Sequence, residues 1–415
     1  MNRLGLTLPR LTISGPLVPF LASLFFIVFA DSLMAYAFPV FVDSTLKSTT
    51  VMGIIMATSS LAGITCDLVF PRILKRQTWK KHLLATILVA GSFPLLSLLG
   101  IQTSLALFFI AASVIWGIYY ELLFFSQQHF VVSKIPKPEY SKTWSTIAII
   151  SSFSLIGGPI LAAQLVEKPH ILFLVVGGFQ VVALLIAFLI GNTKPAENST
   201  ATHISFLGEL RTWWKLAPQL YPVIIVGVLT KSVDAAFWTI GSLFGEHFFS
   251  QVTHLGPITL DHTFTWLPLI MYQIPSVLGS FLLVKLGVTV HKKYISEMML
   301  MLAGVSLVPF FFLGHSLLIM LLIFVAGFGI ALATPLNQAV YSDLIKRAHG
   351  YGEDVVGLAQ ANASLAYIVT PFLVGFSVEK IGYTLTFSIL GTVLLVCSAL
   401  LLLVTPKKIR MPKEI

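Results

Sequence analysis

The chain has 415 residues, of which 56% are hydrophobic and only 10% are charged, and its formal net charge is +9. About a quarter of the residues of a soluble domain are charged. A chain with so few charged residues could not cover a globule with polar surface, so the composition excludes a soluble globular protein. The mean hydropathy of +0.91 agrees with long apolar runs, and about 20 apolar residues are enough for one helix to span a membrane. The sequence therefore predicts an all-α integral membrane protein.

Twelve apolar segments follow one another along the chain. They lie near 17–41, 49–70, 83–101, 104–132, 142–166, 170–191, 219–245, 263–286, 293–313, 316–345, 355–378 and 383–405. We expect an N-terminal six-helix bundle (1–192), a central loop with an interfacial helix (193–217) and a C-terminal six-helix bundle (218–415). Asp31 inside the first segment, and the lack of an A-x-A cleavage site, argue against a removable signal.

The basic residues indicate the orientation. All 26 Lys and Arg residues, except Lys47, Lys168, Lys231 and Lys380, fall on one side if both termini share that side. Cytoplasmic loops are enriched in Lys and Arg, so the sequence predicts that both termini are cytoplasmic. These charges are spread over many short loops, and they therefore do not suggest nucleic-acid binding.

A repeat with an offset of 212 residues links the two halves. The stretch GGPILAAQLVEK (Gly157–Lys168) returns as VTPFLVGFSVEK (Val369–Lys380), with Pro159 at the position of Pro371. Six segments followed by six similar ones, both entering from the same side, predict parallel halves related by an axis along the membrane normal.

The stretch GITCDLVFPRILKR (Gly63–Arg76) resembles the loop signature between the second and third spans of the major facilitator superfamily. The resemblance rests on Gly63, Asp67 and Arg72, and together with the twelve segments it covers essentially the whole chain. It implies a transporter fold with alternating access, in which Asp67 helps to hold the cytoplasmic side closed with Arg72 as its partner.

A second stretch, SLIGGPILAA, resembles the fifth-span motif of antiporters in that family through Gly158 and Pro159. Small residues allow helices to approach closely, and a proline inside a span bends it, so we expect Gly158, Pro159 and Pro371 to act in gating together with Gly63, Asp67 and Arg72. An ordinary kinked packing helix is the alternative interpretation. Ser113 stands where drug antiporters of the family carry an arginine, which argues against that assignment.

Four ionisable side chains lie well inside the predicted spans: Asp31, Glu121, Lys231 and Asp234. A charge at the bilayer centre is costly, so such residues face a cavity, pair, or become neutral. Lys231 and Asp234 are three residues apart, which favours a local ion pair. We expect Asp31 to lie across the central cavity from that pair and to exchange a proton, whereas Glu121 is as suited to a structural role as to a functional one.

Further polar residues fall on spans that line the cavity of the resembled fold. Each could equally bridge two helices, and those near the cytoplasmic ends could belong to a gate. They are Tyr36, Gln127, Trp238, Asn337, Gln338 and Asn362. Aromatic residues around them suit an amphiphilic organic solute better than a sugar.

These observations predict a secondary active transporter that moves a small, amphiphilic organic solute, with proton-coupled efflux as the leading mode. Proton-symport uptake and facilitative uniport are the alternatives. A non-transporting receptor or a lipid-handling protein is a hypothesis of another class. We find no catalytic motif or P-loop, and we predict no enzyme activity, no cofactor and no metal. We expect protons, membrane lipids and the solute as partners, no nucleic acid, a monomer, and a plasma or inner membrane location.

Overall fold

The computed structural model describes residues 17–73, 78–135, 140–190, 206–250, 253–255, 258–260, 262–286, 291–314, 316–347 and 352–404. Within these ranges the chain is almost entirely helical. Eleven of the described helices are long and apolar enough to cross a membrane, and a shorter apolar helix, Leu267–Leu283, accompanies them. The chain is thus a multi-pass integral membrane protein.

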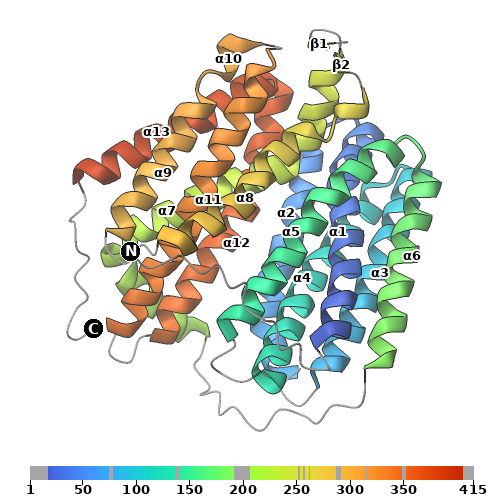
Figure 1. Ribbon diagram of the computed structural model, residues 1–415, viewed down its shortest axis with the longest axis horizontal. Helices are drawn as coiled ribbons and strands as arrows, with labels where there is room; N and C mark the ends of the chain where they lie inside the picture. The colour runs from blue at the N-terminus through green and yellow to red at the C-terminus, as the bar shows by residue number, and fades with distance from the viewer. Residues whose placement is uncertain are drawn as a thin grey trace, which may run out of the picture.

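We call the first six helices the first bundle, and the second of them also packs closely on a helix of the other bundle. Figure 1 shows this bundle in blue to green, beside the second bundle in yellow to red. Its helices are α1 (Leu17–Leu46), α2 (Thr49–Ile73), α3 (Trp79–Thr103), α4 (Ala106–Lys134), α5 (Tyr140–Leu165) and α6 (Pro169–Leu189).

The second bundle contains the remaining helices and a small hairpin between the first two of them. Its elements are α7 (Phe206–Phe249), β1 (Thr253–Leu255), β2 (Ile258–Leu260), the 3-10 turn η2 (His262–Phe264), α8 (Leu267–Leu286), α9 (Lys292–Leu307), α10 (Phe310–Leu313), α11 (Leu318–Arg347), α12 (Gly352–Ile381) and α13 (Tyr383–Val404). Strands β1 and β2 are antiparallel, with Thr253 opposite Leu260.

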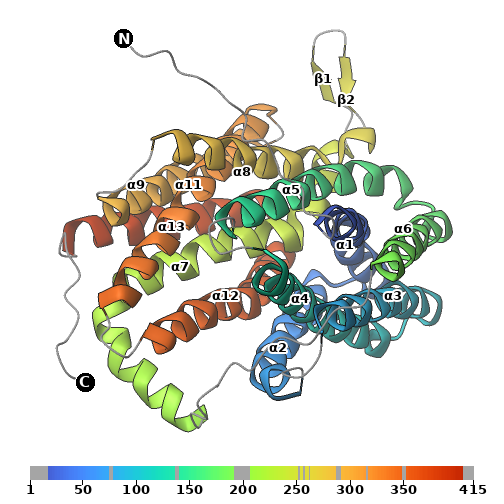
Figure 2. The ribbon, with the colours of Figure 1, turned by 60° about the horizontal axis from the view of Figure 1, so that its bottom comes forward.

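All twelve predicted segments are helical, because each has enough apolar residues to bury its backbone hydrogen bonds in lipid. The ninth is divided at Pro309 into α9 and the short α10. The stretch expected as an interfacial helix is continuous with the seventh span, so that α7 has 44 residues and contains Pro218 and Pro222. Figure 2 shows the bend in α7. The β1–β2 hairpin was not predicted.

The two bundles touch at the end of the molecule that carries the β1–β2 hairpin and the α1–α2 turn, which we call the hairpin end. There the Tyr36 hydroxyl of α1 donates to Thr265 Oγ1, just before α8, over 2.8 Å. Glu379 of α12 accepts hydrogen bonds from Ser48 Oγ (2.8 Å) and from the backbone N–H of Thr50 (3.0 Å). The carboxylate of one bundle therefore caps the first turn of α2 in the other.

Helices α2 and α12 approach closely at the same end. A Cβ atom added to Gly53 would lie 2.2 Å from the carbonyl oxygen of Pro371, and one added to Gly375 would lie 2.4 Å from that of Thr49. Neither site has room for a side chain. These glycines allow backbone-to-backbone contact between the bundles, as small residues do between helices in membranes.

Candidate functional site

Asp31 lies in the middle of α1 with 8% of its surface exposed. Its carboxylate accepts one hydrogen bond from Trp116 Nε1 (2.7 Å) and another from the Tyr120 hydroxyl (2.9 Å). Both donors come from α4, and their spacing of four residues places them on one helix face. Each carboxylate oxygen therefore has one neutral donor.

The sequence predicted that Asp31 lies across the central cavity from the Lys231–Asp234 pair, and the structure shows which groups its carboxylate contacts. Its hydrogen-bond partners belong to its own bundle, because the side chain turns toward α4. Among the described residues, the three ion pairs found do not include Asp31. The carboxylate is thus buried and hydrogen-bonded, with no Lys, Arg or His of the described chain within 4.0 Å.

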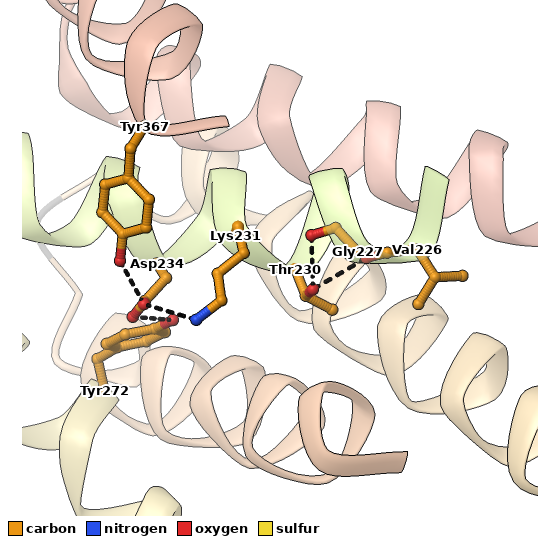
Figure 3. Close-up of polar contacts among 7 residues, drawn as sticks. All are labelled: Val226, Gly227, Thr230, Lys231, Asp234, Tyr272 and Tyr367. Carbon is orange, nitrogen blue, oxygen red and sulfur yellow. Dashed lines mark hydrogen bonds and ion pairs between the residues drawn. The ribbon is translucent and has the colours of Figure 1, made fainter. Parts of the chain in front are cut away.

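Asp234, in the middle of α7, has a different set of partners (Figure 3). The Tyr367 hydroxyl of α12 donates to it over 2.6 Å and the Tyr272 hydroxyl of α8 over 3.2 Å. Lys231 Nζ lies 3.8 Å from Oδ2, so the pairing favoured by the spacing of three residues is present, at a long distance. Two tyrosines satisfy this carboxylate, and a cation balances its charge.

The two carboxylate sites belong to different bundles and interact through their electrostatic fields. Tyr120, which donates to Asp31, is close enough to Asp234 and to Tyr367 for electrostatic interaction. The Asp31 site is formed by α1 and α4, and the Asp234 site by α7, α8 and α12. A change of charge at one site therefore alters the electric field at the other.

A polar pocket adjoins Lys231 in the second bundle, between α7, α11 and α12. Its lining consists of Gly227, Thr230, Lys231, Thr334, Asn337, Gln338, Tyr341, Asn362 and Ala363. These residues include one cation, three amides and three hydroxyls, and none is acidic. Three predicted cavity residues, Asn337, Gln338 and Asn362, therefore lie together here with Lys231.

Hydrogen bonds hold two of the amides in place. Asn337 Nδ2 donates to the backbone carbonyl of Val223 on α7 (3.2 Å), and Asn362 Nδ2 donates to the Tyr341 hydroxyl. Gly227 packs directly against both amides, because an added Cβ atom would lie 3.2 Å from Asn337 Nδ2 and 3.7 Å from Asn362 Nδ2. The pocket is a built arrangement of donors and acceptors.

The other predicted site residues are more scattered. Glu121 of α4 lies against Gly63 of α2, where an added Cβ would be 3.3 Å from Oε1. Gln127 and Trp238 are half-buried. Tyr36 belongs to the hairpin-end contact described above, and its ring is fully buried.

The residues predicted to act in gating have distinct surroundings. Gly158 of α5 packs on Ser32 of α1, where an added Cβ would lie 2.2 Å from Oγ, and Pro159 follows it inside the helix. Pro371 packs against Gly53 at the hairpin end. The side chains of Asp67 and Arg72 lie outside the part of the chain that the structure describes.

Sequence reasoning missed three donors, Trp116, Tyr272 and Tyr367, and the Glu379 contact. Trp116 stands four residues before Tyr120, a spacing that could have indicated a shared face of α4. Glu379 belongs to the repeated Val-Glu-Lys triplet, but its partners on α2 left no signal in the sequence. Ser113, which stands where an arginine was expected, donates to the Ile55 carbonyl of α2 over 2.7 Å.

Comparison with solved structures shows the same fold in several transporters. The nucleoside transporter NupG superposes with a TM-score of 0.72 at 12% identity, covering 94% of this chain and 98% of that one. The peptide transporter POT in complex with sulfate gives 0.70 at 14% identity, with 94% of each chain covered. The human organic anion transporter MFSD10 gives 0.55 at 14% identity, covering 93% and 98%.

A search of the curated proteins finds no match to the chain. The sequence model of the Major Facilitator Superfamily matches residues 20–352 and, in a second match, 232–414, and so spans nearly the whole chain. Together with the helical fold and its buried carboxylates, this match assigns the role of transporter rather than enzyme. The chain belongs to the Major Facilitator Superfamily.

Proposed function

We propose that this protein is a secondary active transporter that exports a small amphiphilic organic solute in exchange for protons, by alternating access. The observation that carries the proposal is the unlike pair of carboxylates at the bundle boundary. Asp234 has Lys231 as its counter-charge. Asp31 has only the neutral donors Trp116 and Tyr120.

A proton is the counter-charge that the Asp31 site lacks. A buried carboxylate without a cation is costly, and binding a proton removes the charge while the hydroxyl and indole donors stay in place. Asp31 can then load a proton from one side of the membrane and release it to the other as the bundles move. Asp234, already paired, serves to hold α7, α8 and α12 in register and to position Lys231.

The arrangement of contacts supports alternating access. We infer that the two bundles are parallel repeats and that both termini are cytoplasmic, so that the hairpin end faces outward. The contacts of Tyr36 with Thr265 and of Glu379 with Ser48 then close the outer side. Transport would require these contacts to break, while the bundles close at the opposite end.

The resemblance of the fifth-helix motif to that of antiporters supports antiport, and the contact of Gly158 with Ser32 supports coupling between α5 and Asp31. Gly158 of α5 packs on Ser32, the residue next to Asp31. A movement of α5 at Gly158 and Pro159 would therefore shift the backbone of α1 beside the carboxylate. Proline and glycine at this point make α5 easier to bend than an unbroken helix. A change in the protonation of Asp31 can therefore be coupled to a change in the shape of α5.

We expect an amphiphilic solute because the walls of its binding site differ in polarity. Tyr120 and Phe124 expose 43% and 40% of their surfaces on α4, whereas the pocket beside Lys231 is polar. Aromatic faces and a few placed polar groups are typical of sites for organic solutes. A sugar would require polar groups on all sides.

Proteoliposomes with imposed pH gradients test the mode of coupling once a ligand has been found by thermal-shift screening of the purified protein. An antiporter accumulates the solute when the lumen is acidic, because the outgoing protons drive the solute inward. A symporter accumulates it when the lumen is alkaline, and a uniporter responds to neither. The sign of the effective gradient thus decides among antiport, symport and uniport, whatever the orientation of the protein in the vesicle.

The alternative class, a receptor or lipid-handling protein, predicts binding without solute flux in the same vesicles.

A separate labelling experiment tests the orientation. A cysteine placed at the exposed Lys47 should react with an impermeant maleimide on intact cells, and one at the exposed Lys215 should react only after permeabilisation. Labelling of Lys215→Cys from outside would reverse the proposed direction of every step.

A further inference from the structure

The polar pocket of the second bundle indicates which chemical group of the solute it binds. Its lining includes Lys231 together with Asn337, Gln338 and Asn362. It contains no carboxylate. Such a lining complements an anionic group with several acceptor oxygens, and it offers nothing to balance a cation.

Lys231 has bonding capacity to spare. Its one ion-pair contact in the described chain, with Asp234, is 3.8 Å long, and the two tyrosines supply much shorter hydrogen bonds to the same carboxylate. An ammonium group has three donors, and the Lys231 side chain is 29% exposed where it borders the pocket. The cation can therefore bind a second oxyanion without leaving Asp234 unsatisfied.

The amides are already oriented for such a ligand. Asn362 and Tyr341 form a hydrogen-bonded pair at the pocket wall, and Asn337 is anchored to the Val223 carbonyl. Because these side chains are held by the protein, little conformational entropy is lost when a ligand group arrives. Gly227 packs against the same two amides, so a larger residue at this position would displace them.

We propose that this pocket binds the carboxylate of the transported solute, so that the substrate class is an organic acid with an apolar body. The inference builds on the proposed function and narrows it. The carboxylate lies between Lys231 and the amides of Asn337 and Asn362, and the apolar body extends toward Tyr120 of α4, which interacts electrostatically with Asp234.

A matched ligand series tests the inference on the purified full-length protein. The probes are arylalkyl carboxylates of increasing length, with the carboxamide, the amine and the phosphate monoester of each. Carboxylates should raise the melting temperature more than their amides and amines at equal concentration. A larger shift with the amines or amides, or no shift with any carboxylate, overturns the proposal. A larger shift with the phosphate monoesters also overturns it, because the preferred ligand group would then be a phosphate.

Two variants place the binding in this pocket. Asn362→Asp has nearly the same shape and can still bond to the Tyr341 hydroxyl, but its negative charge should weaken carboxylate binding by at least about ten-fold and favour amines. Gly227→Val fills the pocket without changing its charge and should weaken every probe. The control is Gly178→Val, since a Cβ atom at Gly178 would touch nothing within 4 Å.

If Asn362→Asp lowers the melting temperature without ligand, Asn362→Ala takes its place, and it should weaken carboxylates more than amides. Unchanged carboxylate binding in Gly227→Val contradicts the assignment of the pocket.

Transport measurements distinguish a failure of this inference from a failure of the proposed function. Carboxylates that bind but never accumulate under either pH gradient would refute the proposed function alone, whereas uphill transport of amines or amides would refute the substrate class alone.

Discussion

The two copies of the repeated stretch make different contacts, although they end in the same three residues. In α5, Gly158 before the proline packs on Ser32 of its own bundle. In α12, Pro371 itself meets Gly53 of the other bundle, and Glu379 caps the first turn of α2 there. The first copy therefore stabilises a bundle internally, and the second joins the two bundles.

The carboxylates of α1 and α7 differ in a similar way. Asp31 is held by two donors from a single neighbouring helix and forms none of the ion pairs found among the described residues. Asp234 is held from two helices, by Tyr272 and Tyr367, and has Lys231 beside it. A charge-balanced site can remain ionised throughout a transport cycle, whereas an unbalanced one is suited to gain and lose a proton.

The largest expected effect comes from Asp31→Asn. The amide keeps the size of the side chain but cannot carry a proton, so accumulation driven by a pH gradient should be abolished. One proton crossing 100 mV supplies about 2.3 kcal/mol, which corresponds to a roughly fifty-fold solute gradient. Solute uptake into proteoliposomes measures the loss, and equilibrium exchange of labelled solute, which needs no net proton movement, should persist.

Asp234→Asn is the matched control for that experiment. It removes a carboxylate of the same kind from the other bundle, but one that already has a cation. We expect weaker transport with the response to the pH gradient retained. If Asp31→Asn still accumulates solute uphill and Asp234→Asn does not, the roles assigned to the two sites are reversed, and Glu121 becomes the next residue to test if both variants accumulate it.

The next effect concerns Lys231. Lys231→Ala leaves Asp234 without a cation in a half-buried position, and we expect a loss of stability of about 1–3 kcal/mol. The double variant Lys231→Ala/Asp234→Asn removes the unpaired charge as well and should recover most of that loss. Thermal unfolding in detergent measures both, and additive losses in the double variant would show that the two residues do not act as a pair.

The fold was predictable from the sequence because the length of an apolar segment determines whether it can span a membrane. The Lys231–Asp234 contact was predictable as well, since residues three apart in a helix share a face. Both inferences use information that lies within a single helix. They need no knowledge of how the helices pack.

The partners of Asp31 were not predictable in that way. Trp116 and Tyr120 share a face of α4, but which helix that face meets depends on the rotation of α4 against α1. The cap that Glu379 provides to α2 depends further on how close the two bundles stand at the hairpin end. Contacts between helices and between bundles arise from packing, and two identical triplets in the sequence carry no sign of their different neighbours.

A smaller effect distinguishes the two proline segments. In Gly53→Ala the new Cβ would lie 2.2 Å from the Pro371 carbonyl oxygen, so the bundles must separate at the hairpin end. Overpacking of this kind costs about 1–3 kcal/mol, enough to shift the balance between closed and open states by about ten-fold. Spin labels at the exposed positions Lys47 and Lys380, with Cys66 and Cys397 replaced, should report a longer distance.

Gly158→Ala is the control, because its Cβ would be equally close to Ser32 but within one bundle. It should lower the melting temperature and leave the distance between the spin labels unchanged. A shift of that distance in Gly158→Ala, equal to the shift in Gly53→Ala, would show that both proline segments control the same opening. The distinction between internal and joining copies would then be wrong.

The smallest effect is expected from Glu379→Ala, compared with Glu167→Ala. Glu379 caps α2 from the other bundle, whereas Glu167, its counterpart in the repeat, is exposed. A carboxylate at a helix N-terminus interacts favourably with the exposed N–H groups, but solvent weakens this interaction at the surface. We expect Glu379→Ala to raise the open population at the hairpin end by less than about five-fold, and Glu167→Ala to leave it unchanged in the same spin-label measurement.

Salt distinguishes the charge of Glu379 from its hydrogen bonds, since at 1 M the screening length is only about 3 Å. A difference between wild type and Glu379→Ala that shrinks in salt identifies the charge as the main contribution, and one that persists identifies the hydrogen bonds to Ser48 and Thr50. Equal effects of the two variants at either salt concentration would mean that Glu379 does not hold the bundles together.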